Sequence, residues 1–516
     1  MDARATTNPP LTGPLIRPGA SVWRAPMADR AACLVDNETY FRLVKHAIAR
    51  AERSILIVGW AFDPRTRLDP LAGEDGLPDA IGEILNAAIA ERPHLEIGLL
   101  IWNMVLPIAA TLDLFPHRAA YWLDERIKLR LADDVPLGAC HHQKTVIVDD
   151  SLAFVSGDDI SPDRWDTSDH ADAQPARELA TGIAYQPHHG LTMMLEGEVA
   201  QALSEAARER WLVSTGEALP PPEPLRAGLW PEEIAPDFTG IPVGIARTLP
   251  ARHGNPAVRE SETLLLDAIA SARRLIYVEN QYFASQAVGD AIARRLAEPD
   301  GPEVVAIVSP HSPSYFDRMV MDAARDALLA ELRRQDPHGR LHVLAPHTSE
   351  GRPVIVHAKT MIVDDTLVRI GSANLNNRSL GFDTELDVAI EAPEGPAGAA
   401  VRARIDGLVD RFAGHFVGVS PDALAAARAR TGSLAGALEA LDGGKRLVRL
   451  EPSGPGFFGA LTARRHLGDP TGAETSFRPW KRRPGPARLT TGHALAAGAI
   501  GALAGFLVAR VLRRGG

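Results

Sequence analysis

Apolar and polar residues follow two different periods along this chain. Short apolar runs alternate with longer segments in which apolar side chains return every three or four positions. The short runs are typical of buried strands, and the longer segments are typical of amphipathic helices. In the first part of the chain we predict helices over 40–53 and 80–91, and strands over 54–59, 95–101, 127–131 and 145–148.

A proline cluster at residues 220–224 marks a linker, and the same order of elements begins again near Ile241. We predict helices over 260–273 and 315–334, strands over 275–278, 304–308, 341–344, 360–363 and 367–370, and more helices between 400 and 450. A repeated order of helix and strand favours a duplicated α/β domain.

One short peptide occurs twice, about 215 residues apart. The first copy is HQKTVIVDD from His142, the second is HAKTMIVDD from His357, and they differ only at the second and fifth positions. His and Lys two residues apart at the start of a strand point to the same face. Two imidazoles and two ammonium groups that converge on one point would bind an anion, and the imidazoles could divide the roles of nucleophile and acid.

The chain resembles the phospholipase D superfamily, whose members carry two H-x-K-x-x-x-x-D motifs. The similarity extends to RWDT at 164–167, to IYVENQYF at 276–283 and to GSANLNNRS at 371–379. It covers roughly residues 25–415 and is strongest to phospholipases D of the eukaryotic type. The resemblance implies an α/β fold, with two duplicated α/β/α sandwich domains, an active site at their interface and a C-terminal tail.

These patterns divide the chain into parts with different expected roles. We predict a flexible leader at 1–24, a first half at 25–215, a linker at 216–240, a second half at 241–415, a helical and Pro/Gly/Arg-rich extension at 416–488 and a candidate membrane helix at 489–509. The last segment lacks charged residues and has the length of a bilayer-spanning helix. An Ala/Gly-rich soluble or disordered tail is the alternative. We therefore expect membrane association through this helix, and otherwise a cytoplasmic protein.

The motif residues suit phosphodiester chemistry. No Asp/Glu cage or Cys/His cluster in the sequence indicates metal ligands, so we expect neither metal nor cofactor, and Lys144 and Lys359 would supply the positive charge. One neutral His would attack and form a phosphohistidine, while the other, protonated, donates to the leaving oxygen. The residues leave the order of the two histidines open. The resemblance favours His142 as nucleophile and His357 as acid/base.

The resemblance also assigns supporting residues. Asp149 and Asp364 complete the two motifs, and we include them in the catalytic set as structural support for the half-sites. Asn374, seventeen residues after His357, matches a family position that helps bind phosphate. The same offset in the first half gives Asp159. We therefore place Asn374 and Asp159 in the substrate-binding set.

One departure from the family pattern concerns the carboxylates that orient the histidines. Glu385 fits that role in the second half and joins the substrate-binding set. In the first half Gly190 stands where relatives of the eukaryotic type have Asp. One imidazole therefore lacks its carboxylate, or uses Asp159 or a backbone carbonyl. The sequence leaves open which histidine Glu385 serves.

We expect a phospholipase D that hydrolyses glycerophospholipids to phosphatidic acid and a free head group, with transphosphatidylation when an alcohol replaces water. The expected partners are a phospholipid substrate, a membrane surface and a water or alcohol acceptor, and a monomer carries both half-sites. The net charge of −10 argues against a nucleic-acid partner. The alternatives are a cardiolipin-synthase-like phosphatidyltransferase, a phosphodiesterase or nuclease of the same superfamily, and an inactive membrane scaffold.

Overall fold

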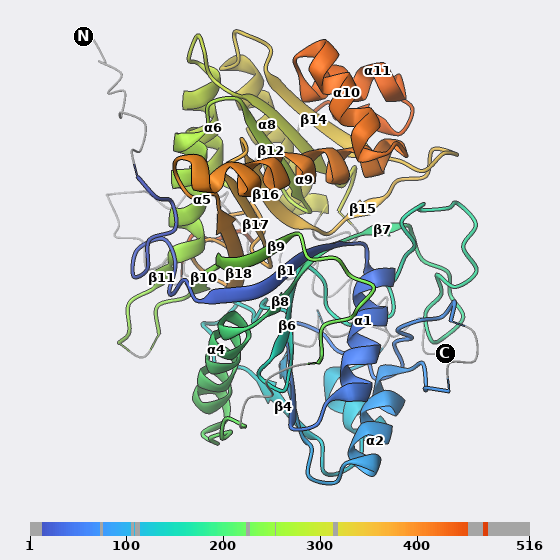
Figure 1. Ribbon diagram of the computed structural model, residues 1–516. Helices are drawn as coiled ribbons and strands as arrows, with labels where there is room; N and C mark the ends of the chain where they lie inside the picture. Colours follow the sequence, from blue (N-terminus) through green and yellow to red (C-terminus); the bar gives the residue numbers. More distant parts are fainter. Residues whose placement is uncertain are drawn as a thin grey trace, which may run out of the picture. The chain divides into compact units, whose positions relative to one another are not determined.

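The structure is a computed structural model that describes residues 13–452, apart from 73–75, 105–107, 109–113, 223–227, 253 and 313–317, together with residues 468–472. Its main elements are two large sheets and the helices that cover them (Figure 1). Residues 1–12 of the predicted leader and the whole candidate membrane helix lie outside the described residues.

The first sheet has eight strands in the order β4-β3-β2-β5-β6-β8-β1-β9. Its strands are β1 (Met27–Val35), β2 (Ser54–Gly59), β3 (Glu96–Trp102), β4 (Lys128–Ala132), β5 (Thr145–Val148), β6 (Leu152–Ser156), β8 (Leu191–Glu196) and β9 (Phe238–Pro242). The associated helices are α1 (Asn37–Arg50), α2 (Ile81–Glu91), the 3-10 helix η1 (Pro116–Trp122) and α4 (Glu198–Thr215).

The second sheet has nine strands in the order β11-β10-β18-β17-β16-β12-β13-β14-β19. Its strands are β10 (Gly244–Leu249), β11 (Val258–Arg259), β12 (Leu275–Asn280), β13 (Glu303–Val308), β14 (Leu341–Pro346), β16 (Lys359–Val363), β17 (Leu367–Gly371), β18 (Glu385–Glu391) and β19 (Leu447–Arg449). The associated helices are α5 (Glu260–Ser271), α6 (Gln286–Leu296), η2 (Arg318–Asp322), α8 (Ala323–Arg334), η3 (Pro396–Gly398), α9 (Ala399–Val417), α10 (Pro421–Thr431) and α11 (Leu434–Asp442).

The two sheets share one topology. The run β4-β3-β2-β5-β6-β8-β1 of the first sheet has the same order as β14-β13-β12-β16-β17-β18-β10 of the second. The strand directions agree as well, because β2 pairs in parallel with β3 and antiparallel with β5, as β12 does with β13 and β16. The predicted fold class, a duplicated α/β domain, is confirmed.

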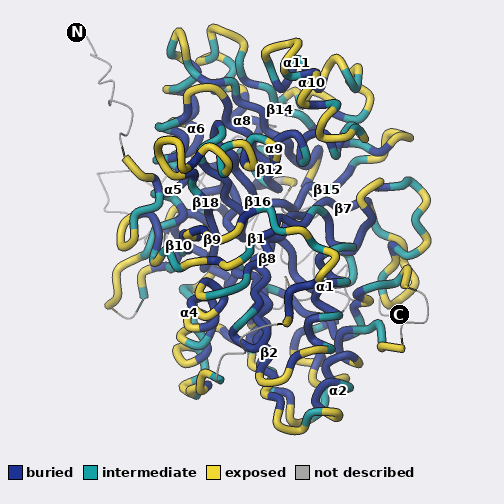
Figure 2. The backbone as a smooth tube through the Cα atoms, in the orientation of Figure 1, coloured by how far each residue is buried: buried dark blue, intermediate teal, exposed yellow. Residues whose placement is uncertain are grey.

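Strand residues alternate between two cores, as their apolar sequences predict. In β2, Ile55 and Ile57 pack with α1 and α2, whereas Leu56 and Val58 face a core that also contains residues of the second sheet. In β12, Ile276 packs on the outer side with α5 and α6, and Tyr277 on the shared side. Strands buried on both faces are continuously apolar. The two sheets therefore meet across a common hydrophobic core, and their strands form the buried interior in Figure 2.

A separate two-stranded sheet joins the halves. Strand β7 (His188–His189) pairs in parallel with β15 (Ile355–Val356), so a segment just before β8 lies beside the segment just before the second motif. The amide of Ile355 donates to the carbonyl of Pro187 at 2.9 Å. This short pairing brings His188 and His189 of the first half next to His357 of the second.

One predicted helix differs in the structure. The sequence predicts a continuous helix over 315–334, but the described part begins with the π-helical turn η2, and α-helical geometry starts only at Ala323. Just before α8, the carboxylate of Asp322 accepts hydrogen bonds from the amide and hydroxyl of Ser312. This local bonding fixes the chain in a wider turn.

The structure corrects the localisation that the sequence predicts. Among the described residues no helix is long and apolar enough to cross a membrane. The longest helices, α4 and α9, carry charged side chains at several positions and pack on the protein core. Residues 489–509 lie outside the described residues, and a C-terminal transmembrane helix is not retained. The remaining boundaries of the predicted parts stay predictions.

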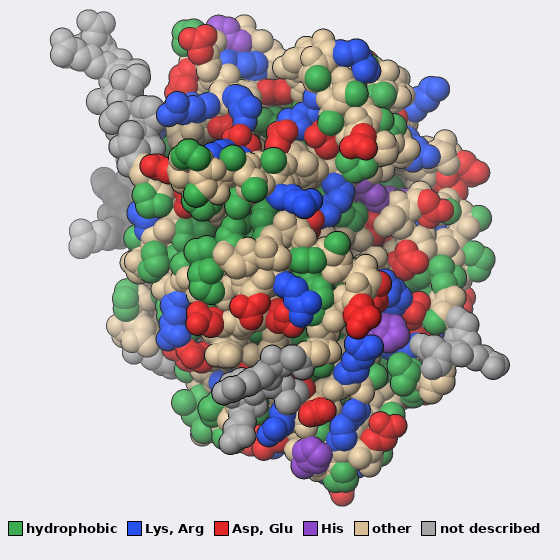
Figure 3. Space-filling view, in the orientation of Figure 1, with side chains coloured by type: hydrophobic (Ala, Val, Ile, Leu, Met, Phe, Trp, Pro, Cys, Tyr) green, Lys and Arg blue, Asp and Glu red, His purple; other side chains and the backbone are tan. Residues whose placement is uncertain are grey.

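Charged side chains of both signs are interspersed on the face of the molecule in Figure 3. This distribution accompanies the moderate negative net charge of −10. A mixed surface of this kind differs from the basic stripe that a phosphate backbone requires.

Candidate active site

Each motif histidine is anchored through its backbone to the opposite half. The amide of His142 donates to the carbonyl of Thr384 at 2.9 Å, and the amide of His357 donates to the carbonyl of His189 at 2.8 Å. His142 lies just before β5, and His357 lies just before β16. Each of these strands is near the middle of its sheet. The two predicted half-sites are thus brought together at the interface of the halves.

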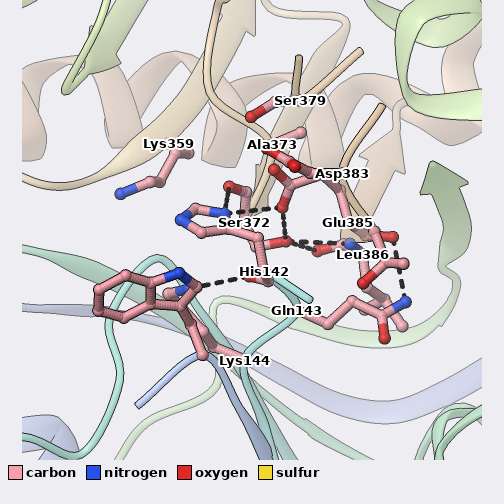
Figure 4. A network of polar contacts seen from close by, with 12 residues as sticks. His142, Gln143, Lys144, Lys359, Ser372, Ala373, Ser379, Asp383, Glu385 and Leu386 are labelled. Atoms are coloured by element: carbon pink, nitrogen blue, oxygen red, sulfur yellow. Dashed lines mark hydrogen bonds and ion pairs between the residues drawn. The ribbon is translucent and has the colours of Figure 1, made fainter. Parts of the chain in front are cut away.

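The ring of His142 is held by acceptors from the second half. Its Nδ1 lies 3.0 Å from Oε2 of Glu385 and 3.1 Å from the carbonyl oxygen of Ser372 (Figure 4). A carbonyl oxygen can only accept, so Nδ1 carries the proton. The Nε2 atom of neutral His142 therefore has a free lone pair. Glu385 serves His142, which answers a question that the sequence leaves open.

The ring of His357 is held by a carboxylate from the first half. Its Nδ1 lies 2.8 Å from Oδ1 of Asp158. The Nζ atom of Lys359 is also 2.9 Å from this nitrogen, and one Nδ1 cannot donate to Asp158 and accept from Lys359. The buried carboxylate can only accept, and its ionised form requires donors, so we assign Nδ1–H to the bond with Asp158.

The two motif lysines are placed alike. Nζ of Lys144 donates to the carbonyl of His142 at 2.9 Å, and Nζ of Lys359 donates to the carbonyl of His357 at 2.5 Å. Both side chains are buried, and Lys359 reaches from the second half toward the ring of His142 (Figure 4). Two buried lysines beside two imidazoles form a site for an anion. Burial lowers the pKa of Lys359 well below its ordinary value, and a bound anion would favour its ammonium form.

The electrostatics favour neutral imidazoles in the free site. Burial, Lys144 and Lys359 lower the pKa of His142 well below its ordinary value. Burial and Lys359 likewise lower the pKa of His357, against the opposite effect of Asp158. An anionic phosphodiester near the lysines would offset their effect and favour protonation of one imidazole.

The carboxylates beside the two histidines differ in their protonation. Burial raises the pKa of Glu385 well above its usual range. Burial acts in the same direction on Asp158, but the imidazoles of His188 and His357 outweigh it and hold the pKa of Asp158 well below its usual range. His357 therefore has an ionised neighbour, whereas His142 has a weakly acidic one.

The motif aspartates bind backbone amides at equivalent places. The carboxylate of Asp149 accepts from the amides of residues 52–54 at 2.7 to 2.8 Å, and that of Asp364 accepts from the amides of residues 273–275 at the same distances. Both aspartates have left-handed φ angles, 54° and 52°. Each carboxylate thus fixes the loop that enters the strand beside its motif.

The three predicted substrate-binding residues lie in this region in different settings. Asn374 is 2% exposed and follows β17. Asp159 accepts from the amides of Trp60 and Ala61 and forms an ion pair with Lys144 at 3.2 Å. Glu385 contacts His142, as described above. The roles of all three in binding substrate stay predictions.

Sequence reasoning missed the group around Asp158. Oδ1 of Asp158 lies 2.8 Å from Nε2 of His188 as well as from His357. The available signal was the pair Asp158-Asp159, because the corresponding residues after the second motif are Ala373-Asn374. An extra acid in one copy of a repeat marks a local difference between the halves.

A second histidine cluster lies between the halves and was not foreseen from the sequence. The potential metal-ligand atoms of Asp36, His170, His189 and His415 lie within 4.8 Å of one another. His189 bridges Asp36 and Glu279 through its two nitrogens at 2.7 and 2.8 Å. Although burial opposes it, these carboxylates raise the pKa of His189 to about 10. A protonated imidazole has no free lone pair, so His189 acts as an ion-pair partner.

Comparison with known proteins identifies relatives for most of the chain. A family profile described as "Cardiolipin synthase, PLD-like domain" matches residues 265–404. Phospholipase D1 of Saccharomyces cerevisiae is 25% identical over 71% of this chain and 27% of its own length. Phospholipase D alpha 4 of Arabidopsis thaliana is 22% identical over 67% and 59%, and cardiolipin synthase A of Pseudomonas putida is 27% identical over 48% and 43%. The chain therefore spans less than two thirds of each of these relatives.

A solved structure shows the same fold. Phosphatidylserine synthase of Haemophilus influenzae matches with a TM-score of 0.50 and 15% identity, over 76% of this chain and 88% of that protein. The two motifs, the duplicated sheets and the sequence relatives agree with one another. This chain belongs to the phospholipase D superfamily.

Proposed function

We propose that this protein is a phospholipase D, which hydrolyses a glycerophospholipid to phosphatidic acid and a free head group through a phosphohistidine. The proposal rests on the similar placement of His142 and His357. Each ring is held through its Nδ1 atom by an acceptor from the opposite half. This arrangement leaves the Nε2 atom of each ring for the reaction, one to attack phosphorus and one to transfer a proton.

In the first step, Nε2 of His142 attacks phosphorus, and the bond from phosphorus to the head-group oxygen breaks. His357, protonated on binding the anionic diester, gives its Nε2 proton to that oxygen. Lys144 and Lys359 donate to the non-bridging oxygens and stabilise the charge that develops on them. The free Nε2 lone pair of His142 supports its role as nucleophile, and the ionised Asp158 beside His357 supports the role of acid.

In the second step, His357 takes a proton from water through Nε2, and the water oxygen attacks phosphorus. The bond from phosphorus to His142 breaks, and phosphatidic acid leaves. An alcohol in place of water gives a phosphatidyl alcohol by the same route. Both motif halves lie on one chain, so a monomer suffices, and the lipid substrate is met at a membrane surface.

A cardiolipin-synthase-like phosphatidyltransferase is the second candidate. The description of the profile that matches residues 265–404 favours it. The relatives named phospholipase D support the first candidate, because they match 71% and 67% of the chain and the cardiolipin synthase matches 48%. The two reactions share the first step and differ in the acceptor, which is water in one and a lipid alcohol in the other.

The test is incubation of the purified protein with phosphatidylcholine vesicles and ethanol without added metal. His142→Ala and His357→Ala are the variants, and His338→Ala, at an exposed position, is the matched control. We expect phosphatidic acid and phosphatidylethanol from wild type and control, and neither from the two variants. No product from folded, vesicle-bound wild type would contradict the assignment for phosphatidylcholine. Phosphatidylglycerol vesicles that yield cardiolipin would then support the transferase.

A further inference from the structure

The strand pairing defines which residues of the two half-sites are equivalent. On the first sheet Ser156 of β6 pairs with Thr192 of β8, and on the second Gly371 of β17 pairs with Asp387 of β18. Ser156 and Gly371 each lie fourteen residues after their motif histidine. Asp158 and Ala373 each lie two positions after these strand residues and are therefore equivalent. Gly190 and Glu385 each lie two positions before the paired residues and are equivalent as well.

This equivalence shows that the halves carry one carboxylate each, at different places. The second half has Ala373 in the loop after β17 and Glu385 at the start of β18. The first half has Asp158 in the loop after β6 and Gly190 before β8. Both carboxylates cross the interface to the motif histidine of the other half, Glu385 at 3.0 Å and Asp158 at 2.8 Å.

Gly190 leaves the space that Asp158 occupies. A Cβ atom at position 190 would lie 2.0 Å from Oδ2 of Asp158, far inside van der Waals contact. The same Cβ would be 3.1 Å from both side-chain amide atoms of Asn37, so a shift toward that side is hindered as well. A side chain at position 190 and the carboxylate of Asp158 therefore exclude each other.

Neighbouring side chains hold Asp158 in this place. Its amide donates to Oγ of Ser156 at 2.9 Å, and that hydroxyl also accepts from Thr192 at 2.7 Å. Its Oδ1 lies 2.8 Å from Nε2 of His188, and Nε of Arg164 is 3.7 Å away. The contacts to Oδ1 offset the burial of this oxygen, whereas Oδ2, beside Gly190, has no hydrogen-bond partner among the described residues.

We propose that Asp158 is the positioning residue for His357, and that Asp158 and Gly190 form an exchanged pair that replaces a carboxylate at position 190. The proposal rests on the proposed function, because it gives Asp158 the task of holding His357 for proton transfer. It implies that a carboxylate can be moved back. An aspartate at position 190 should restore the site once Asp158 is removed, and should damage it while Asp158 is present.

The variants that test this are Asp158→Ala, Gly190→Asp, the double variant with both changes, and Glu385→Gln as the matched control in the other half. One measurement is the rate and pH profile of cleavage of an activated phosphodiester, bis(p-nitrophenyl) phosphate, beside phosphatidylcholine. The other is the tautomer of His357 from nitrogen chemical shifts of the histidine-labelled protein, with the signal assigned by its loss in His357→Ala.

We expect both single first-half variants to lose on the order of 10²-fold or more in kcat/KM on phosphatidylcholine, as when a catalytic histidine loses its carboxylate. The loss on bis(p-nitrophenyl) phosphate should be far smaller, because its leaving group needs no proton from His357. The double variant should recover to within about tenfold of wild type. In wild type the proton of His357 should be on Nδ1. In Asp158→Ala it should move to Nε2, because Lys359 at 2.9 Å then donates to Nδ1, and the double variant should restore it. Glu385→Gln should leave this tautomer unchanged.

A wild-type tautomer and pH profile in Asp158→Ala would overturn the positioning role. A double variant no better than Asp158→Ala in rate and tautomer would overturn the exchange, provided that circular dichroism shows it folded. Failure of the wild type to cleave any diester would count against the proposed function alone, since the tautomer reports on Asp158 without turnover.

Discussion

The two half-sites place their motif residues on equivalent backbone but surround the histidines with different carboxylates. In both halves the lysine donates to the carbonyl of its own histidine, and the aspartate fixes the neighbouring loop. The carboxylate that reaches each imidazole differs in identity, position and charge, with Glu385 weakly acidic and Asp158 ionised. A duplicated scaffold can therefore give two identical imidazoles different properties through one neighbour each.

The largest expected effect is the loss of activity when either motif histidine is removed, and its dependence on the leaving group should distinguish the two histidines. His142→Ala should lose about 10⁴-fold or more in kcat on every diester, because the nucleophile is absent. His357→Ala should lose about 10²–10⁴-fold on phosphatidylcholine, but far less in the first step on a p-nitrophenyl ester, whose leaving group needs no proton. Burst kinetics would measure that step. Equal losses of both variants on both substrates would contradict the division of roles.

The motif lysines should be the next most sensitive, and they should be alike. Lys144→Met and Lys359→Met keep the length of the side chain and remove the charge, and each should lower kcat/KM by about 10²–10³-fold. Steady-state kinetics on phosphatidylcholine vesicles would measure this. A variant that stays within a few-fold of wild type would show that its half-site does not contact the phosphoryl group.

The motif aspartates should affect stability and leave the chemistry intact. Asp149→Ala and Asp364→Ala each remove the acceptor of three backbone amides, so each should lower the free energy of unfolding by about 2–4 kcal/mol. Urea denaturation would measure the loss, with Asp300→Ala at an exposed position as control. The kcat of the folded fraction should stay near that of wild type. A large loss of kcat at full stability would give these residues a direct part in the reaction.

The last prediction compares two buried histidines by the pH dependence of stability, which changes only gradually with each pH unit. The pKa of His189 is raised to about 10, so its protonation favours the folded state; this contribution is complete below about pH 6.5 and is lost as pH rises toward 10. Burial lowers the pKa of His141 to about 4, so its contribution is lost as pH falls from about 6.5 toward 4. Each slope should be at most about 1.4 kcal/mol per pH unit. His189→Gln should flatten the alkaline side alone, and an unchanged alkaline slope in urea titrations would exclude His189 as its source.

Much of the fold could be predicted from local patterns. The predicted strands 54–59 and 145–148 coincide with β2 and β5. A short, continuous apolar run between turns is typical of a strand that is buried on both faces of its sheet. The π-helical turn at Arg318–Asp322 was not predicted, because its residues continue the apolar spacing of a regular helix; the hydrogen bond from Ser312 to Asp322 at its end exists only in the folded chain.

The motif residues could be read from the repeat, but their partners could not. Sequence reasoning left one of the two imidazoles with Asp159, a backbone carbonyl or no carboxylate, and did not say which imidazole this was. The structure places Asp158 there, because adjacent residues in the loop after β6 point in different directions. Asp158 faces His357, whereas Asp159 faces Lys144. The cluster around His189 was missed for a different reason, since its members come from four separate segments of the chain that only the fold brings together.

The backbone amides of His142 and His357 make the placement of each histidine depend on the opposite half. Each donates to a carbonyl of the opposite half, and each ring is oriented from there as well. A hinge motion that parted the halves would break the backbone anchor and the ring orientation of both histidines at once. Both histidines therefore keep their positions only while the two sheets stay together.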